Sequence, residues 1–139
     1  MYGGVYAKAY VAGDEPAMKI LGEDYVRYML EVVAYYQEQA QLIVGDAIPQ
    51  VLLIHAYALN ADYLDRLLTR LEQSGAQWIS LDQALQHSAY QRRADGYTGG
   101  GGITWLHRWS ITEKRDPSIY AGEPEVPDLE QLLKSAQRP

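Results

Sequence analysis

The segment Gln50-Val51-Leu52-Leu53-Ile54-His55 is an almost continuous apolar run that ends on a histidine. Strands with one solvent-facing side alternate apolar and polar residues, whereas strands covered on both faces do not. The run therefore predicts a buried strand of a parallel sheet over Val51 to Ile54. Because α/β proteins concentrate their chemistry at the carboxyl ends of such strands, His55 is placed where an active site would lie.

A helix and a second strand are expected to follow this histidine. Asn60 can cap the helix with Asp62 in its first turn, and Gly75 can end it. The expected buried stripe of this helix consists of Leu64, Leu67, Leu68 and Leu71. Gln77 to Ile79 is a second short strand, so residues 50–86 predict a β-α-β-α unit with parallel strands and a right-handed crossover.

Two helices are expected before this unit. Tyr2 to Ala12 is rich in small residues and is followed by Gly13, a typical helix stop. Asp14 can then cap a long amphipathic helix that runs to about Val44, with Gly22 as a possible interruption. The apolar positions of this helix recur at three and four residues, at Leu21, Tyr25, Tyr28, Met29, Val32 and Tyr36.

The C-terminal third of the chain is less periodic. Ser80 followed by Gln83 is a capping-box pattern for a short helix, and another short helix is expected over Asp128 to Ser135. Between them, Gly99-Gly100-Gly101-Gly102 lacks the Lys-Ser/Thr pair of a phosphate loop, so we expect a turn there. Residues 1–90 are expected to form one part of the chain, and residues 91–139 a C-terminal extension containing glycines and tryptophans.

Composition excludes several classes of partner. The net charge of −6 and the lack of a basic patch argue against nucleic acid. The chain has no cysteine and therefore neither a disulfide nor a thiolate metal site. It has no run of about 18 apolar residues and no basic-then-apolar N-terminus. We therefore expect a soluble chain without a membrane span or a signal peptide, and its cellular location stays open.

Three strings of residues point to a family. They are Leu52-x-x-His55 followed by Leu59-Asn60-Ala61-x-x-Leu64, then Trp78-Ile79-Ser80-Leu81-Asp82-x-Ala84-Leu85, and finally Gly102-Ile103-Thr104-Trp105-Leu106-His107-Arg108-Trp109. Together they resemble the C-terminal end of the polysaccharide deacetylases, the carbohydrate esterase family 4 hydrolases. The resemblance implies an α/β fold, as a partial (β/α)-barrel-like fragment with few parallel strands and a high helix content. It also implies metal-dependent removal of N- or O-acetyl groups from sugars.

The resemblance implies a catalytic role for His55, as the general acid that protonates the leaving amine or alkoxide. It places Leu52 in the pocket for the acetyl methyl group. The family also uses a divalent metal such as zinc, bound by an aspartate and two histidines from Asp-Asp and His-x-x-x-His motifs. Neither motif occurs in this sequence. We therefore expect no cofactor in this chain, which would begin partway through an enzyme and be inactive alone.

Several further residues have two interpretations each. Tyr57 can line a substrate pocket or be a loop residue without a role. Trp105, with His107 and Trp109, can stack on a sugar ring, or this segment can anchor the C-terminal extension. A new metal site built from His55, His87 and aspartates is a third hypothesis for the histidines. The acidic residues at helical spacing are interpreted as a solvated face, and they are Asp62, Asp65 and Glu72.

Two functions from different classes follow. The first is the C-terminal fragment of a polysaccharide deacetylase, a hydrolase of carbohydrate metabolism. The alternative is a non-catalytic module, derived from that fold, that binds acetylated carbohydrate or assembles with itself. Because two strands with open edges are prone to pair with other chains, a homodimer or larger homo-oligomer is expected in either case.

Overall fold

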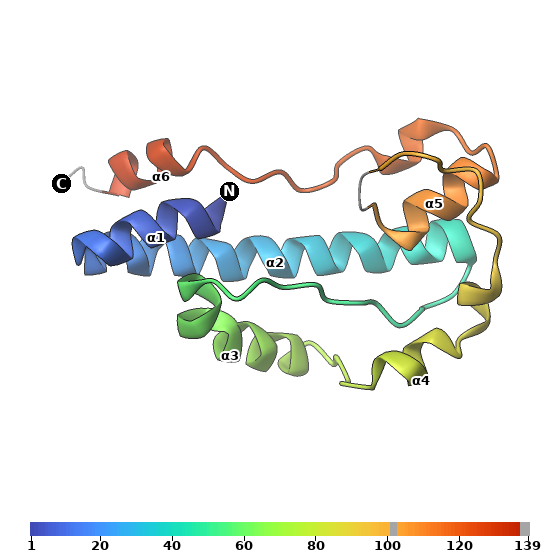
Figure 1. Cartoon of the computed structure of the whole chain (residues 1–139), viewed down its shortest axis with the longest axis horizontal. Helices are drawn as coiled ribbons and strands as arrows, with labels where there is room; N and C mark the ends of the chain where they lie inside the picture. Colours follow the sequence, from blue (N-terminus) through green and yellow to red (C-terminus); the bar gives the residue numbers. More distant parts are fainter. Residues whose placement is uncertain (101–102, 137–139) are drawn as a thin grey trace. The chain divides into compact units, whose positions relative to one another are not determined.

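The computed structural model describes residues 1–100 and 103–136 (Figure 1). Within these residues the chain forms helices and no β-strand. The predicted α/β, (β/α)-barrel-like fold is therefore wrong for this chain. In chain order the elements are α1 (Tyr2–Ala12), α2 (Glu15–Val44), α3 (Ala58–Gln73), α4 (Leu81–Leu85), the 3-10 helix η1 (Ser88–Gln91), α5 (Trp105–Thr112), the 3-10 helix η2 (Pro117–Tyr120) and α6 (Leu129–Ala136).

Both predicted strands are irregular segments. Val51–Ile54 and Gln77–Ile79 take part in no ladder with any described residue, and Leu53 is 80% exposed. A strand is stabilised only by hydrogen bonds to a neighbouring strand, and a sheet of two strands is marginal in water. An apolar run favours burial, but it does not provide the neighbouring strand that a β-strand needs.

The two N-terminal helices were predicted with their boundaries. Gly13 ends α1 in the left-handed conformation, with φ of 66°. Asp14 caps α2, because its Oδ1 accepts a hydrogen bond from the Ala17 amide at 3.0 Å. The suggested interruption at Gly22 does not occur, since α2 continues through it to Val44.

Helix α4 follows its capping signal, and α6 forms where a short helix was predicted. Ser80 and Gln83 form the reciprocal capping box of α4. Asp128 precedes α6, and its Oδ1 accepts hydrogen bonds from the amides of Glu130 and Gln131, each at 3.0 Å. Helix α5 was not predicted as a helix, although Thr104 caps it by accepting from the amide of His107. Gly101 and Gly102, on which part of the glycine turn was predicted, lie outside the described residues.

The chain divides into two compact units. The first comprises Met1–Val32, Leu53–Gln77 and Pro124–Pro139, and the second comprises Val33–Leu52 and Trp78–Glu123. Helix α2 begins in the first unit and ends in the second. The division expected from the sequence, at residue 90, stays a prediction.

In the first unit, α1 and α3 pack together against the first half of α2. Tyr6 of α1, Leu21 of α2 and Leu67 of α3 are each 1% exposed or less. Gly22 allows a close approach of α3, because a Cβ at this position would overlap the ring of Tyr63. Of the leucine stripe predicted for α3, Leu67 and Leu71 are buried while Leu64 and Leu68 are partly exposed.

The second unit has its own apolar core around α5. Its buried members are Ala40, Ile43, Ile48, Ala89, Leu106 and Trp109. Arg115 closes the end of α2, because its guanidinium donates hydrogen bonds to the carbonyls of Leu42 and Ile43 at 3.2 and 2.8 Å. Across the described part of the chain, we find no helix with the length and apolar character that crossing a membrane requires.

Candidate functional site

His55 lies in the first unit, in the irregular segment just before α3, and its side chain is exposed. Its imidazole stacks on the ring of Tyr57, with 5.4 Å between centroids and 28° between planes. Tyr57 is itself 51% exposed. Its ring lies against α1, where a Cβ on Gly3 would come within 2.6 Å of Tyr57 Cδ2. The structure thus brings together two of the predicted site residues, His55 and Tyr57.

Asn60 fixes the backbone that carries His55. The prediction that Asn60 caps α3 is wrong, because the helix begins at Ala58 with Tyr57 at the N-cap. Instead, Asn60 Nδ2 donates to the His55 carbonyl at 2.6 Å, and Asn60 Oδ1 accepts from the hydroxyl of Tyr25 at 2.8 Å. The polar side chain links α2 and α3 to the histidine segment while leaving the imidazole open to solvent. Sequence reasoning missed this role, although the five-residue spacing from His55 to Asn60 is its signal.

Leu52 and Trp105 belong to the second unit. Leu52 is partly buried, and Trp105 is 43% exposed at the start of α5. The guanidinium of Arg108 lies 5.6 Å from the Trp105 ring centroid, a cation–π distance. Trp109, one turn further on, is fully buried. The aromatic segment therefore has one residue in the core and one that remains available for a contact.

The other two histidines, His87 and His107, make contacts that stabilise the fold. His87 Nδ1 accepts a hydrogen bond from the Ala89 amide at 3.2 Å, as the N-cap of η1. The ring of His107 lies 3.9 Å from that of Tyr120, centroid to centroid. Burial lowers the pKa of His107, and Glu123 opposes this effect. In a protein with only three histidines, His55 is the one whose ring is exposed.

The described residues do not fit the metal centre that the family resemblance implies. Among residues 1–100 and 103–136, no three His, Asp or Glu side chains converge in a way that could hold a metal ion. A catalytic zinc needs three protein ligands and an open position. No metal-dependent step is therefore assigned to the side chains described here.

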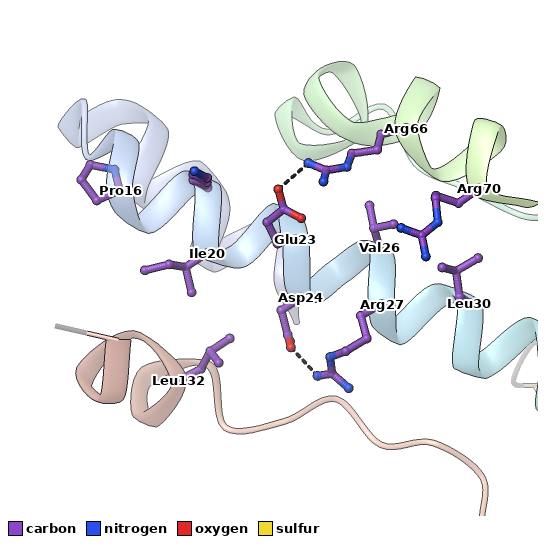
Figure 2. A pocket seen from close by; sticks show the side chains of 11 residues that line it. Pro16, Ile20, Glu23, Asp24, Val26, Arg27, Leu30, Arg66, Arg70 and Leu132 are labelled. Carbon is purple, nitrogen blue, oxygen red and sulfur yellow. Dashed lines mark hydrogen bonds and ion pairs between the residues drawn. The ribbon is translucent and has the colours of Figure 1, made fainter. Parts of the chain in front are cut away.

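A groove of about 800 Å³ lies on the first unit (Figure 2). His55 is not among the residues that line it. Helices α2, α3 and α6 contribute its lining residues, which are Pro16, Lys19, Ile20, Glu23, Asp24, Val26, Arg27, Leu30, Arg66, Arg70 and Leu132. Arg66 of α3 forms an ion pair with Glu23 of α2. Arg27 pairs with Asp24 and, at 2.7 Å, with Glu31.

The carboxylates of this groove are already engaged. Asp24 is 9% exposed and accepts hydrogen bonds from Arg27 and from the hydroxyl of Tyr2. Burial, together with this bond to Asp24, raises the pKa of Tyr2 well above its ordinary value. The Asp24 carboxylate is thus held between an arginine and a tyrosine. We therefore interpret the groove as a junction between helices lined by ion pairs, and not as an acid–base site.

No protein-family model matches this chain, and no curated protein or solved structure shows significant similarity to it. The resemblance to the polysaccharide deacetylases therefore rests on the strings of residues given above.

Proposed function

We propose that this chain is the C-terminal part of a polysaccharide deacetylase-like hydrolase and that His55 is its general acid. The observation that carries the proposal is the combined pattern Leu52-x-x-His55, Leu59-Asn60-Ala61 and Trp78-Ile79-Ser80-Leu81-Asp82. The exposed imidazole and the anchored backbone of His55 support it, because a proton donor must reach its substrate from a fixed position.

The chemistry assigned to this chain is a single proton transfer. Deacetylation breaks the bond between the acetyl carbon and a sugar nitrogen or oxygen, and the departing atom must be protonated. An imidazole suits this task because histidine ordinarily titrates near neutral pH. The metal and the base that activate water are not found among the described residues, so deacetylation by this chain alone is not proposed.

The first test is to read the DNA upstream of the Met1 codon. An open frame that continues upstream and encodes an Asp-Asp strand and a His-x-x-x-His motif is the expected result. In the protein expressed from that whole frame, His55→Gln should lower kcat on an acetylated sugar oligomer by about 10²–10⁴-fold, the usual contribution of a general acid. Acetate release measures this rate.

His87→Gln is the matched control, since it changes a histidine that caps η1 and should leave kcat unaltered. Equal activity of the His55→Gln and parent enzymes would overturn the assignment. A stop codon directly before Met1, with saturable binding of an acetylated oligosaccharide that Trp105→Ala weakens, would instead favour the non-catalytic module. The partial exposure of Trp105 beside Arg108 is the observation that supports this non-catalytic alternative.

A further inference from the structure

We propose that Tyr57 is a positioning residue for His55, and that Gly3 forms the seat on α1 against which the Tyr57 ring lies. The proposal rests on the function proposed above for His55, since it concerns how a general acid is held in place. The side chain of His55 is exposed, so close packing does not fix the direction of its imidazole. A general acid must nevertheless meet its substrate from one defined direction.

A three-residue turn brings the rings of His55 and Tyr57 together. The Tyr57 amide donates a hydrogen bond to the His55 carbonyl at 2.9 Å, which closes a turn around Ala56. The imidazole lies on the phenol ring, with 5.4 Å between centroids and 28° between planes. Stacked rings attract each other beyond the apolar area that they bury. The stack therefore favours one side-chain rotamer of His55 over the others.

Tyr57 is itself held at its backbone and at its ring. Its carbonyl accepts hydrogen bonds from the amides of Asn60 and Ala61, at 3.0 and 3.1 Å, in the first turn of α3. At Gly3 of α1, a Cβ would come within 2.6 Å of Tyr57 Cδ2 and 3.0 Å of Tyr57 Cε2. The ring thus occupies space that any side chain at position 3 would fill. Because the atoms of a ring move together, a larger residue there must displace the whole ring.

Two adjacent glycines of α1 differ in this contact. Gly4 is exposed, and nothing lies within 4 Å of a Cβ added to it. A change from glycine to alanine favours the helix by a similar amount at either position. Gly3→Ala and Gly4→Ala are therefore a matched pair, in which only the first displaces the ring of Tyr57.

Nuclear magnetic resonance of the His55 imidazole tests the proposal in this chain. An aromatic ring displaces the resonances of protons beside it, so those of His55 should differ from the values of a free imidazole. Tyr57→Leu and Gly3→Ala should return them toward the free values. Tyr57→Phe, which keeps the ring, and Gly4→Ala should leave them in place. Circular dichroism checks that each variant keeps its helix content, and His55→Gln assigns the resonances.

Two results of this experiment overturn the proposal. The first is a set of His55 resonances that Tyr57→Leu leaves where they are, since the Tyr57 ring would then not hold the imidazole. The second is an equal displacement by Gly3→Ala and Gly4→Ala, since the contact at Gly3 would then have no specific effect.

Kinetics separate this proposal from the one on which it rests. In the protein expressed from a continuing frame, Tyr57→Leu should lower kcat by up to about 10²-fold, the cost of misplacing a catalytic group by about 1 Å, with KM unchanged. Tyr57→Phe should keep the parent kcat. A raised KM with unaltered kcat would make Tyr57 a substrate-lining residue and overturn the positioning role. If the resonances move as expected but His55→Gln keeps full activity, the proposed function fails while the stack stands.

Discussion

At the scale of single residues, tyrosine hydroxyls form several of the hydrogen bonds between helices of the first unit. Tyr6 is 1% exposed, and its hydroxyl donates to Asp62 Oδ2 at 2.6 Å. The sequence indicated Asp62 only as a residue in the first turn of this helix, which is wrong because α3 begins at Ala58 and has no acidic residue in its first turn. Its actual partner comes from another helix, which no local pattern can specify.

Loss of this hydrogen bond should be visible as a stability change. Tyr6→Phe should lower the free energy of unfolding by about 1–3 kcal/mol, because an apolar ring keeps the packing while Asp62 loses a donor. Tyr10→Phe on the same helix is the control, since Tyr10 is 56% exposed. Urea unfolding measures both. An equal change in the two variants would contradict a specific role for the Tyr6 hydroxyl.

The same residue makes stability depend on alkaline pH. Burial, together with the bond to Asp62, raises the pKa of Tyr6 in the folded protein above the ordinary value near 10. The unfolded chain therefore loses this proton first. Its contribution to stability is complete below about pH 10 and is lost as the pH rises toward the folded pKa. Unfolding curves at rising pH should fall less steeply for Tyr6→Phe than for the parent chain.

At the scale of elements, most helices were predictable from the sequence, whereas the two predicted strands do not form among the described residues. Helix boundaries such as Asp14 and the Ser80–Gln83 capping box rest on hydrogen bonds within a few residues, so the sequence contains all that is needed to find them. A strand over Val51–Ile54 needs a neighbour elsewhere in the chain or in another chain. Likewise, the sequence placed His55 at the end of an apolar run but could not show that Asn60 would hold its carbonyl.

The packing of α3 on α2 depends on a missing side chain. Gly22→Ala should destabilise the first unit, because the added Cβ must displace the Tyr63 ring, which packs edge-on against Tyr6 at 6.1 Å. In a Tyr63→Ala background the same change should become stabilising by up to about 1 kcal/mol, the helix-propensity gain of alanine over glycine.

Gly4→Ala provides the reference value for that gain. Gly4 is an exposed position of α1, with nothing within 4 Å of an added Cβ. Thermal or urea unfolding of the four variants measures all these differences. If Gly22→Ala were as stabilising as Gly4→Ala in the parent chain, the close approach of Tyr63 would be disproved.

At the scale of the whole molecule, one helix serves two separate cores. The first half of α2 is buried by α1 and α3, and its last turns pack in the apolar cluster around Trp109. Most of the stability of a helix in a protein comes from such packing rather than from its own propensity. Each half of α2 should therefore unfold together with the unit to which it belongs.

Trp109→Ala should destabilise the second unit without destabilising the first. Removing the largest fully buried side chain should cost about 3–5 kcal/mol in the second unit. Hydrogen exchange should accelerate in α5 and in residues 33–44 of α2, while α1 and α3 keep their protection. Trp105→Ala, at a 43% exposed position on the same helix, is the control. Uniform acceleration along the chain would show that the two cores unfold as one.

The division into two units also decides what optical probes can see. All three tryptophans, Trp78, Trp105 and Trp109, lie in the second unit, whereas the first unit contains tyrosines and no tryptophan. Fluorescence excited selectively at tryptophan therefore reports on one unit alone. A melting curve recorded in this way describes the second unit, and the unfolding of the first unit needs a second probe, such as hydrogen exchange in α1 and α3.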